Sequence, residues 1–280
     1  MTTELRFGPP PASTLDLSPT GEDVERFRQN GFLAVERLTT DEELAWLTDV
    51  FHAVFEEVDG DGGEPGHPKA RFQSMFPELK YPELLGTTFR RNAKRYAAAL
   101  LGVDEDQLSS WGHMIRKPVG NNRLAPWHQD EAYWESELRY QALGAWLPLH
   151  DVSVEMGAMQ FIPGSHRWGV VNHRFHDGDP AHNLLAADGV DESAAVPCPL
   201  PAGGATFHHC RTLHYTAPNT TDRERLAYPI EFQVAPVRRA RPAARPWVDE
   251  YRAATGRGPL TFYIADGEVV RNGLGHSSAS

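Results

Sequence analysis

Residues 142–164 read ALGAWLPLHDVSVEMGAMQFIPG and contain two short apolar runs, Ala142–Leu149 and Ala158–Ile162, with a polar segment between them. Short apolar runs bounded by Gly, Pro and polar residues are typical of β-strands. Similar runs lie on both sides of this stretch, at Trp111–Lys117, Ala205–His208 and Leu226–Val234. Short strands at irregular intervals, without βαβ alternation, predict a sandwich, jelly roll or barrel.

The residues before Trp111 predict helices instead. Thr40–Glu43 has the pattern of a capping box, and apolar residues recur at helical spacing after it. A short apolar strand is expected at Phe32–Val35. Helices are therefore predicted at Gly21–Asn30, from Thr40 onward and at Pro82–Leu101, the first ended by Gly31 and the last by Gly102.

The chain is expected to form one domain over residues 20–280, after a loose Pro-, Ser- and Thr-rich arm at residues 1–19. We divide that domain into a helical part (20–104), a strand-rich core (105–240) and a C-terminal extension (241–280). The His-rich segment at about 170–197 shows no clear period. A loop of this length in a compact domain predicts a lid or a binding loop.

The composition excludes several functional classes. With 27 Lys and Arg against 38 Asp and Glu, the net charge is −11, which argues against binding to nucleic acid or to anionic membranes. No apolar run approaches the ~20 residues of a membrane span, and the N-terminal residues do not resemble a secretory signal. Two cysteines, Cys198 and Cys210, give no disulfide framework, and we expect free thiols in the cytoplasm.

His128 and Asp130 are the first candidates for a metal site. If the segment PWHQDEAYW (126–134) is extended, residues 128 and 130 point to the same side, so an imidazole and a carboxylate can bind one ion. A hydrogen-bonded surface pair is the alternative. His214, at the start of a later strand, can complete a 2-His-1-carboxylate triad. Arg225 follows it by eleven residues and suits the carboxylate of a dicarboxylate co-substrate.

These residues resemble the phytanoyl-CoA dioxygenase family of non-haem iron(II)- and 2-oxoglutarate-dependent oxygenases. The resemblance runs from about Glu22 to Val234. It rests on His128-Gln129-Asp130, Trp146-Leu147-Pro148-Leu149, Gly157–His166 and the stretch from His214 to Arg225. It implies a mainly β fold with flanking helices, namely a double-stranded β-helix (a jelly-roll or cupin-like core) with the N-terminal helices packed on one sheet.

The resemblance also implies roles for individual residues. His128, Asp130 and His214 match the iron ligands, and Arg225 matches the partner of the distal carboxylate of 2-oxoglutarate, assisted by Thr216. Trp146 and Gln129 match positions that line the co-substrate. His113 falls where relatives often carry Met, and Lys69 or Arg71 matches a further basic position. By strand alternation Trp134 is expected on the metal side and Tyr133 on the opposite side; Arg139 and His209 are further candidates for substrate contact.

The implied activity is the hydroxylation of an unactivated C–H bond of a small molecule, with Fe(II), 2-oxoglutarate and O₂, and with release of succinate and CO₂. We expect a small metabolite, such as a secondary-metabolite intermediate, because the acidic chain shows no basic patch for CoA phosphates. Desaturation, epimerisation and cyclisation are open as outcomes. The alternatives are a non-catalytic jelly-roll protein that binds a metal or ligand, and a zinc hydrolase.

Overall fold

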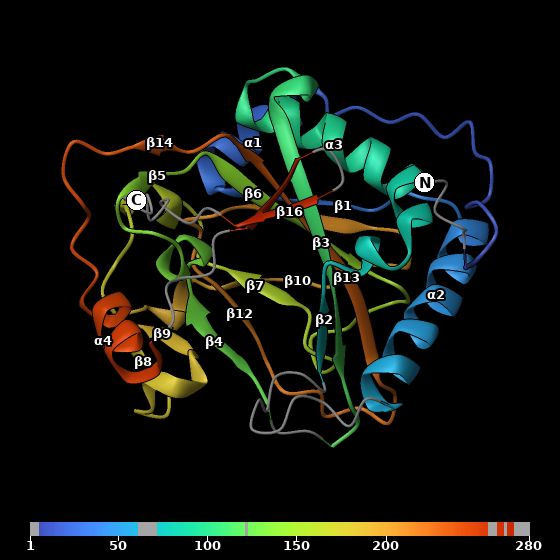
Figure 1. Ribbon diagram of the computed structural model, residues 1–280. Coiled ribbons are helices and arrows are strands. Elements are labelled where there is room, and N and C mark those ends of the chain that lie inside the picture. The colour runs from blue at the N-terminus through green and yellow to red at the C-terminus, as the bar shows by residue number, and fades with distance from the viewer. Residues whose placement is uncertain (1–5, 61–71, 121–122, 257–261, 266–267, 272–280) are drawn as a thin grey trace, which may run out of the picture.

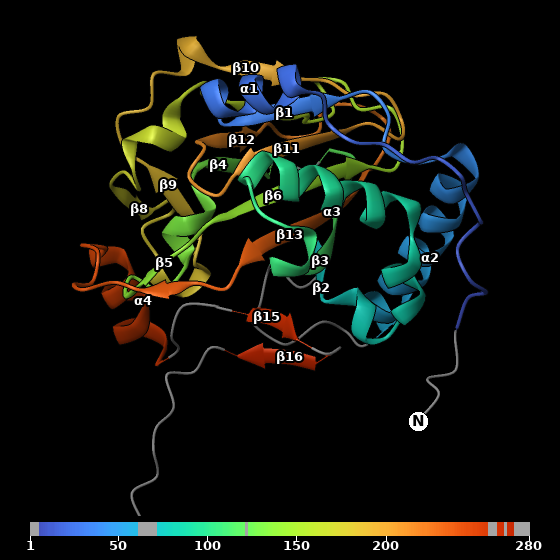
Figure 2. The same ribbon diagram turned by 90° about the horizontal axis from the view of Figure 1, so that it is seen from above.

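Two antiparallel sheets packed face to face form the core of the protein (Figures 1 and 2). This computed structural model describes residues 6–60, 72–120, 123–256, 262–265 and 268–271. In spatial order the larger sheet contains β1 (Phe32–Val35), β11 (Ala205–His209), β6 (Ala142–Pro148), β13 (Arg225–Val234), β3 (Leu108–Lys117) and β2 (Gln73–Met75). The smaller sheet contains β10 (Val196–Cys198), β7 (Met159–Phe161), β12 (His214–Thr216) and β4 (Ala125–His128).

Shorter elements decorate this core. Two-stranded sheets join β5 (Leu138–Arg139) to β14 (Val237–Arg238), β8 (His173–Phe175) to β9 (Leu185–Ala187), and β15 (Phe262–Ala265) to β16 (Glu268–Arg271). The α-helices are α1 (Gly21–Asn30), α2 (Asp41–Gly60), α3 (Thr88–Leu101) and α4 (Pro246–Thr255). Short 3₁₀ helices are η1 (Pro77–Leu79), η2 (Pro82–Gly86), η3 (Glu105–Gln107), η4 (Asp130–Tyr133), η5 (Ser165–Trp168), η6 (Pro180–His182) and η7 (Glu192–Ala194).

The N-terminal helices cover the outer face of the larger sheet. Alternate residues of β6, Leu143, Ala145 and Leu147, are buried in one apolar cluster with side chains of α1, α2 and α3. The ring of Tyr96 on α3 stacks on Phe207 of β11, with 5.2 Å between ring centroids. The predicted jelly roll with helices packed on one sheet is therefore confirmed, and the inner faces of the two sheets enclose a separate apolar cluster around Trp146 and Phe161.

Most predicted element boundaries agree with the structure. Helix α1 begins after a capping box of Thr20 and Asp23 and ends at Gly31, which has φ +81°. The expected helix at Pro82–Leu101 starts later, because Pro82–Gly86 forms a 3₁₀ turn and the hydroxyl of Thr87 caps α3 by accepting from the Arg90 N–H.

The N-terminal arm is irregular, as expected, but residues 6–19 are not loose. The backbone N–H of Phe7 donates to Glu83 Oε1 at 2.7 Å, and Asn92 on α3 donates to the Leu15 carbonyl at 3.3 Å. Residues 1–5 of the predicted arm lie outside the described residues. The 3₁₀ helix η2 and helix α3 therefore anchor this segment through polar contacts that composition alone does not reveal.

The segment at 170–197 is also more ordered than predicted. It contains the β8–β9 hairpin, and Phe175 and Leu185 pack with Trp247 and Tyr251 of α4 in one buried cluster. Figure 1 shows α4, β8 and β9 together on the side of the molecule opposite α2. Residues 257–261, 266–267 and 272–280 of the predicted extension lie outside the described residues.

None of the helices in the described residues is both long and apolar enough to cross a membrane.

Glu43 joins the start of α3 to α2. Its carboxylate is buried and accepts hydrogen bonds from the backbone N–H groups of Thr88 and Phe89 and from the hydroxyl of Thr39. The first N–H groups of a helix have no partner within the helix, so this carboxylate satisfies donors that burial would otherwise leave unpaired.

We predict that Glu43→Ala lowers the free energy of unfolding by about 2 kcal/mol, because it leaves buried N–H groups without an acceptor. Urea denaturation followed by circular dichroism measures this change. Glu42→Ala, at the exposed neighbouring position, is the control and should change stability by less than about 0.5 kcal/mol. Equal effects of the two substitutions would contradict the capping role.

Candidate metal and co-substrate site

His128, Asp130 and His214 come together where β4 and β12 of the smaller sheet pair. His128 ends β4 and is paired directly with His214 at the start of β12. Gln129 is extended (φ −120°, ψ 134°), so Asp130, the first residue of η4, points to the same side as His128. Asp130 Oδ1 lies 3.4 Å from His214 Nε2 and 3.7 Å from His128 Nε2.

The two imidazoles are oriented for metal binding by their outer nitrogens. His128 Nδ1 lies 2.7 Å from the Pro126 carbonyl, and His214 Nδ1 lies 2.9 Å from the Thr212 carbonyl. A carbonyl oxygen only accepts, so Nδ1 carries a hydrogen in each ring, and Nε2 is the atom directed toward Asp130 and available to a metal. Burial alone would lower the pKa of His214, but Asp130 raises it, so a metal ion would displace a proton from this Nε2. This donor set, with its ligand atoms within 4.8 Å of one another, fits a 2-His-1-carboxylate iron(II) site.

The electrostatics of the cluster suit a cation. Burial and the neighbouring His214 lower the pKa of His128 to about 3, which keeps the His128 ring neutral and able to bind a metal. Burial alone would raise the pKa of Asp130, but His214 and His208 hold it well below its usual value. Asp130 is therefore ionised at neutral pH.

His208 holds the second oxygen of Asp130, a contact that sequence analysis missed. His208 Nε2 lies 3.2 Å from Asp130 Oδ2, which leaves Oδ1 toward the other two histidines. His209, which we predicted as a substrate contact, turns away: its Nδ1 accepts from the Arg211 N–H at 3.0 Å. Adjacent residues of a strand point to opposite faces, and the structure turns His208 inward.

Arg225 and Lys117 form a buried cationic end of the site. Arg225 is 2% exposed; its Nη1 donates to the Gly157 carbonyl at 3.0 Å, and its guanidinium lies 5.3 Å from the centre of the Trp146 ring. Lys117 Nζ donates to Thr216 Oγ1 at 3.0 Å and to the Ala217 carbonyl. Among the described residues neither cation has a carboxylate partner, and Arg225 Nε is buried without an acceptor.

The buried Arg225 guanidinium, with the Lys117 amine opposite it on the neighbouring strand, has no anion to balance its charge among the described residues. Burial lowers the pKa of Arg225 to about 10, and burial together with Arg225 lowers that of Lys117 to about 6. A dicarboxylate would supply the missing charge and the missing acceptor, which fits 2-oxoglutarate. Gly157 leaves room for the Lys117 amine, because a Cβ at this position would lie 3.3 Å from Lys117 Nζ. Its φ of +86° also favours glycine.

Lys117 was not singled out from the sequence. The signal for it is strand register, because β13 pairs with β3 so that Lys117 lies directly opposite Arg225. His113 lies on the same face of β3 as Lys117, with its Nδ1 buried and without a partner. Burial lowers the pKa of His113 to about 4. Lys69 and Arg71, the basic positions suggested by the family resemblance, lie outside the described residues.

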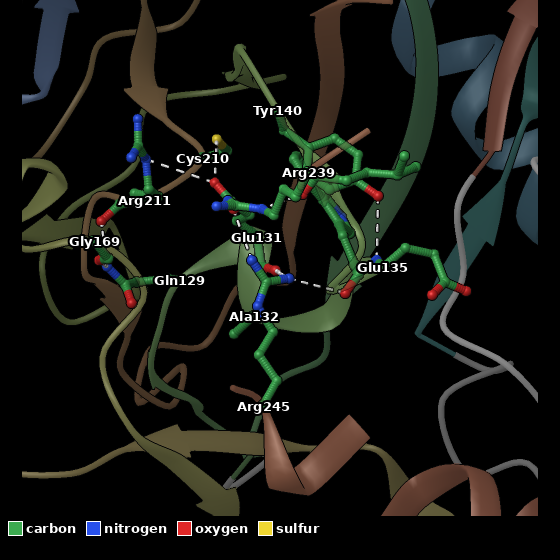
Figure 3. A network of polar contacts seen from close by, with 12 residues as sticks. Gln129, Glu131, Ala132, Glu135, Tyr140, Gly169, Cys210, Arg211, Arg239 and Arg245 are labelled. Atoms are coloured by element: carbon green, nitrogen blue, oxygen red, sulfur yellow. Dashed lines mark hydrogen bonds and ion pairs between the residues drawn. The ribbon is translucent and has the colours of Figure 1, made fainter. Parts of the chain in front are cut away.

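The structure contradicts the prediction that Gln129 lines the co-substrate. Its side chain is buried and its amide nitrogen donates to the carbonyls of Gly169 (2.8 Å) and Arg211 (2.6 Å), while its Oε1 accepts from the Val171 N–H at 2.8 Å. Gln129 points away from the metal cluster because it lies between two residues that face it. Through these hydrogen bonds Gln129 connects the loops after η5 and after β11 to the segment 128–130, which we call the metal motif (Figure 3).

The predicted roles of Trp134 and Arg139 also change. The chain leaves the extended conformation at Asp130 and forms η4, so strand alternation does not continue to residue 134. The Trp134 ring packs on Tyr140, at 4.8 Å between centroids, whereas Tyr133 lies edge-on to His128 at 5.8 Å. Arg139 is exposed on β5 and lines a surface hollow with Arg238, Arg239 and Arg241.

A buried ion-pair network holds η4 in place (Figure 3). Glu131, next to Asp130, accepts from Arg245 at 2.7 Å and from Arg239 at 3.2 Å, and Arg211 lies 3.6 Å away. Arg245 also donates to the Glu131 and Trp134 carbonyls. The C-terminal extension thus fixes the metal motif, a role that sequence analysis did not assign.

Taken together, the jelly roll and its cluster of two histidines and one carboxylate define the 2-His-1-carboxylate class of oxygenase folds. The model of the family described as phytanoyl-CoA dioxygenase matches residues 27–227. The chain belongs to the phytanoyl-CoA dioxygenase family.

Individual relatives support this assignment. Phytanoyl-CoA dioxygenase domain-containing protein 1 of Bos taurus is 32% identical over 142 residues, 49% of this chain and 48% of that protein, so the match spans about half the length of this curated relative. EvdO2 from Micromonospora carbonacea var. aurantiaca is 36% identical, with a TM-score of 0.75 over 83% of this chain and 99% of that chain. A structure of EvdO2 complexed with 2-oxoglutarate matches with the same coverage, at 34% identity and a TM-score of 0.73. The non-haem alpha-ketoglutarate-dependent carbocyclase SnoK is 27% identical, with a TM-score of 0.59 over 83% of this chain and 90% of that chain.

We predict that Arg245→Met lowers the free energy of unfolding by about 3 kcal/mol, because it removes the shortest ion pair of the buried Glu131. Metal affinity should fall about tenfold, since Asp130 lies next to Glu131. Chemical denaturation and metal titration measure the two effects. Arg238→Met, which removes an exposed pair with Glu137, is the control; a metal affinity unchanged in Arg245→Met would contradict a positioning role for the network.

Proposed function

We propose that the protein is an iron(II)- and 2-oxoglutarate-dependent dioxygenase that hydroxylates an unactivated C–H bond of a small metabolite, with release of succinate and CO₂. The observation that carries the proposal is a buried Arg225 without a carboxylate partner among the described residues, with Lys117 next to it, close to a complete 2-His-1-carboxylate cluster: Lys117 donates to Thr216, which lies two residues after His214 on β12. A protein that only binds a metal has no use for this pair of cations. A zinc hydrolase uses the same ligand types but needs no dicarboxylate.

One group of residues is assigned to bind the metal and another to bind the co-substrate. His128 Nε2, His214 Nε2 and Asp130 Oδ1 are assigned to iron, and His208 donates to Asp130 Oδ2 so that the carboxylate keeps its orientation. Arg225 and Lys117 bind the distal carboxylate of 2-oxoglutarate. Since Lys117 donates to Thr216 Oγ1, the Thr216 hydroxyl hydrogen is free to donate to the same carboxylate.

When bound, iron(II) and 2-oxoglutarate supply O₂ activation and the oxidation of a C–H bond. The protein contributes placement and a water-poor surrounding: Trp146 and Phe161 are buried between the two sheets beside the cluster. The similarity to SnoK, a carbocyclase of nogalamycin biosynthesis, supports a secondary-metabolite substrate. The proposal includes a cytoplasmic location, which the two free, buried cysteines support.

We expect anaerobic protein loaded with Fe(II) to bind 2-oxoglutarate and, on exposure to air, to release succinate even without substrate. Arg225→Met should weaken 2-oxoglutarate binding by about 100-fold, because it removes a charge-assisted pair, and should leave metal affinity unchanged. His214→Ala should lose the metal itself. Calorimetry and succinate chromatography make these measurements. Iron-loaded protein that neither binds 2-oxoglutarate nor forms succinate would contradict the proposal and favour a non-catalytic binder.

The reaction outcome is distinguished by product mass. Hydroxylation adds one oxygen atom to the substrate, desaturation or cyclisation removes two hydrogen atoms, and epimerisation leaves the mass unchanged.

A pH-dependent signature follows from Lys117. Its pKa of about 6 in the free protein leaves the amine neutral at pH 8, and a bound dicarboxylate would raise that pKa, so 2-oxoglutarate binding should take up a proton. Calorimetry at pH 8 in buffers of different ionisation enthalpy measures this uptake. Lys117→Met should abolish the uptake and lower the affinity about tenfold. Proton uptake that persists in Lys117→Met would show that another group titrates.

A further inference from the structure

A row of three residues on the inner face of the larger sheet offers polar atoms that neither the metal nor the co-substrate uses. Strand register aligns His208 on β11, Gly144 on β6 and Glu231 on β13 directly across the sheet. Residues aligned in this way share one face. Because His208 contacts Asp130, that face is the one directed at the metal cluster.

Gly144 lets the two polar side chains converge. A Cβ at this position would lie 2.8 Å from His208 Cε1 and 2.9 Å from Glu231 Oε1, and both distances are shorter than a van der Waals contact allows. The φ of Gly144 is not in the left-handed region, so the backbone itself does not require glycine here. The glycine is needed for space, and it allows His208 and Glu231 to bring their ligand atoms within 4.8 Å of one another and of Asp130.

Both side chains keep an acceptor without a partner. Glu231 is 8% exposed, and its Oε2 is buried with no hydrogen bond among the described residues. His208 directs Nε2 at Asp130 Oδ2, so the ring hydrogen lies on Nε2, and Nδ1 is a buried, unused acceptor. Buried acceptors without donors are costly, and they indicate a ligand that supplies the hydrogen.

We propose that Glu231 and His208 form the substrate-recognition subsite, and that the substrate presents a hydroxyl or amino group to it beside the metal. This inference rests on the proposed function and deepens it. The inner face is then polarised: the cationic end at Arg225 and Lys117 takes the dicarboxylate, and the acceptor end takes a molecule with O–H or N–H donors. A carboxylate or phosphate group is disfavoured at the acceptor end by repulsion from the ionised Asp130. Burial and the neighbouring Asp130 raise the pKa of Glu231 well above its usual value, so Glu231 acts there as a hydrogen-bonding group and not as a fixed charge.

The same three groups could instead hold a second metal ion, with Asp130 shared between two ions. The hydrogen bond from His208 Nε2 to Asp130 Oδ2 argues against a second ion, because it occupies the nitrogen and the oxygen that would have to bind the metal. The nitrogen of His208 that has no partner among the described residues is Nδ1. Metal stoichiometry decides between the two: the proposal expects one metal per chain, and two per chain, with one lost in Glu231→Leu, would overturn it.

The test uses the full chain loaded with Zn(II) and 2-oxoglutarate, after loading has been verified. Failure to load 2-oxoglutarate counts against the proposed function, whereas the steps below test only the subsite. Three probes share one ring and differ in charge: trans-1,2-cyclohexanediol, cyclohexylammonium and cyclohexanecarboxylate. Saturation-transfer NMR titrations should show the diol or the ammonium binding at least about tenfold more tightly than the carboxylate.

The variants locate the binding. Glu231→Leu should weaken the preferred probe about tenfold and keep its affinity for 2-oxoglutarate. Gly144→Ala should also weaken the probe, by separating His208 from Glu231; because His208 orients Asp130, the Zn(II) content of this variant is measured before the titration. Glu137→Gln, which changes a carboxylate near the surface, is the matched control and should have no effect. If only Gly144→Ala folds, it alone carries the test. Three results would overturn the proposal: equal or tighter binding of the carboxylate, no binding of any probe, or affinities unchanged in the folded variants. A preference for the diol indicates a neutral substrate, and a preference for the ammonium indicates a cationic one.

Discussion

The carboxylate of Asp130 is the group on which the site is built. One of its oxygens lies between the Nε2 atoms of His128 and His214, and the other is held by His208. A partly buried carboxylate among three imidazoles is stable only if its position is fixed and its charge is balanced. The 3₁₀ turn that begins at Asp130 supplies the position, and Glu131, bound to Arg245, fixes the turn.

The inner face of the larger sheet carries two opposite polarities on neighbouring strands. Arg225 and Lys117 are aligned across β13 and β3, whereas Glu231 and His208 are aligned across β13, β6 and β11. Arg225 is the first residue of β13, and Glu231 lies six residues further along the same strand. The Arg225 guanidinium lies over the ring of Trp146 on β6. This separation lets a dianionic co-substrate and a donor-bearing substrate reach one metal from different sides without competing for the same groups.

The sequence was sufficient for much of the fold, because caps, glycines and short apolar runs mark the ends of α1, β6 and β13 locally. The positions of His128, Asp130 and His214 follow from spacing and family resemblance. Lys117 and His208 could not be identified in the same way, since their roles depend on strand register and on which member of the His208–His209 pair turns inward. Strand alternation misassigned Trp134 because the backbone changes from strand to 3₁₀ helix at Asp130.

Anomalous diffraction at the iron edge, from anaerobic crystals that contain Fe(II) and 2-oxoglutarate, tests the central claim most directly. We expect one iron peak per chain, bonded to His128 Nε2, Asp130 Oδ1 and His214 Nε2 at about 2.0–2.2 Å, with the distal carboxylate of 2-oxoglutarate on Arg225. An iron peak bonded to His208 and Glu231 instead, or a structure in which His214 is not a ligand, would contradict it.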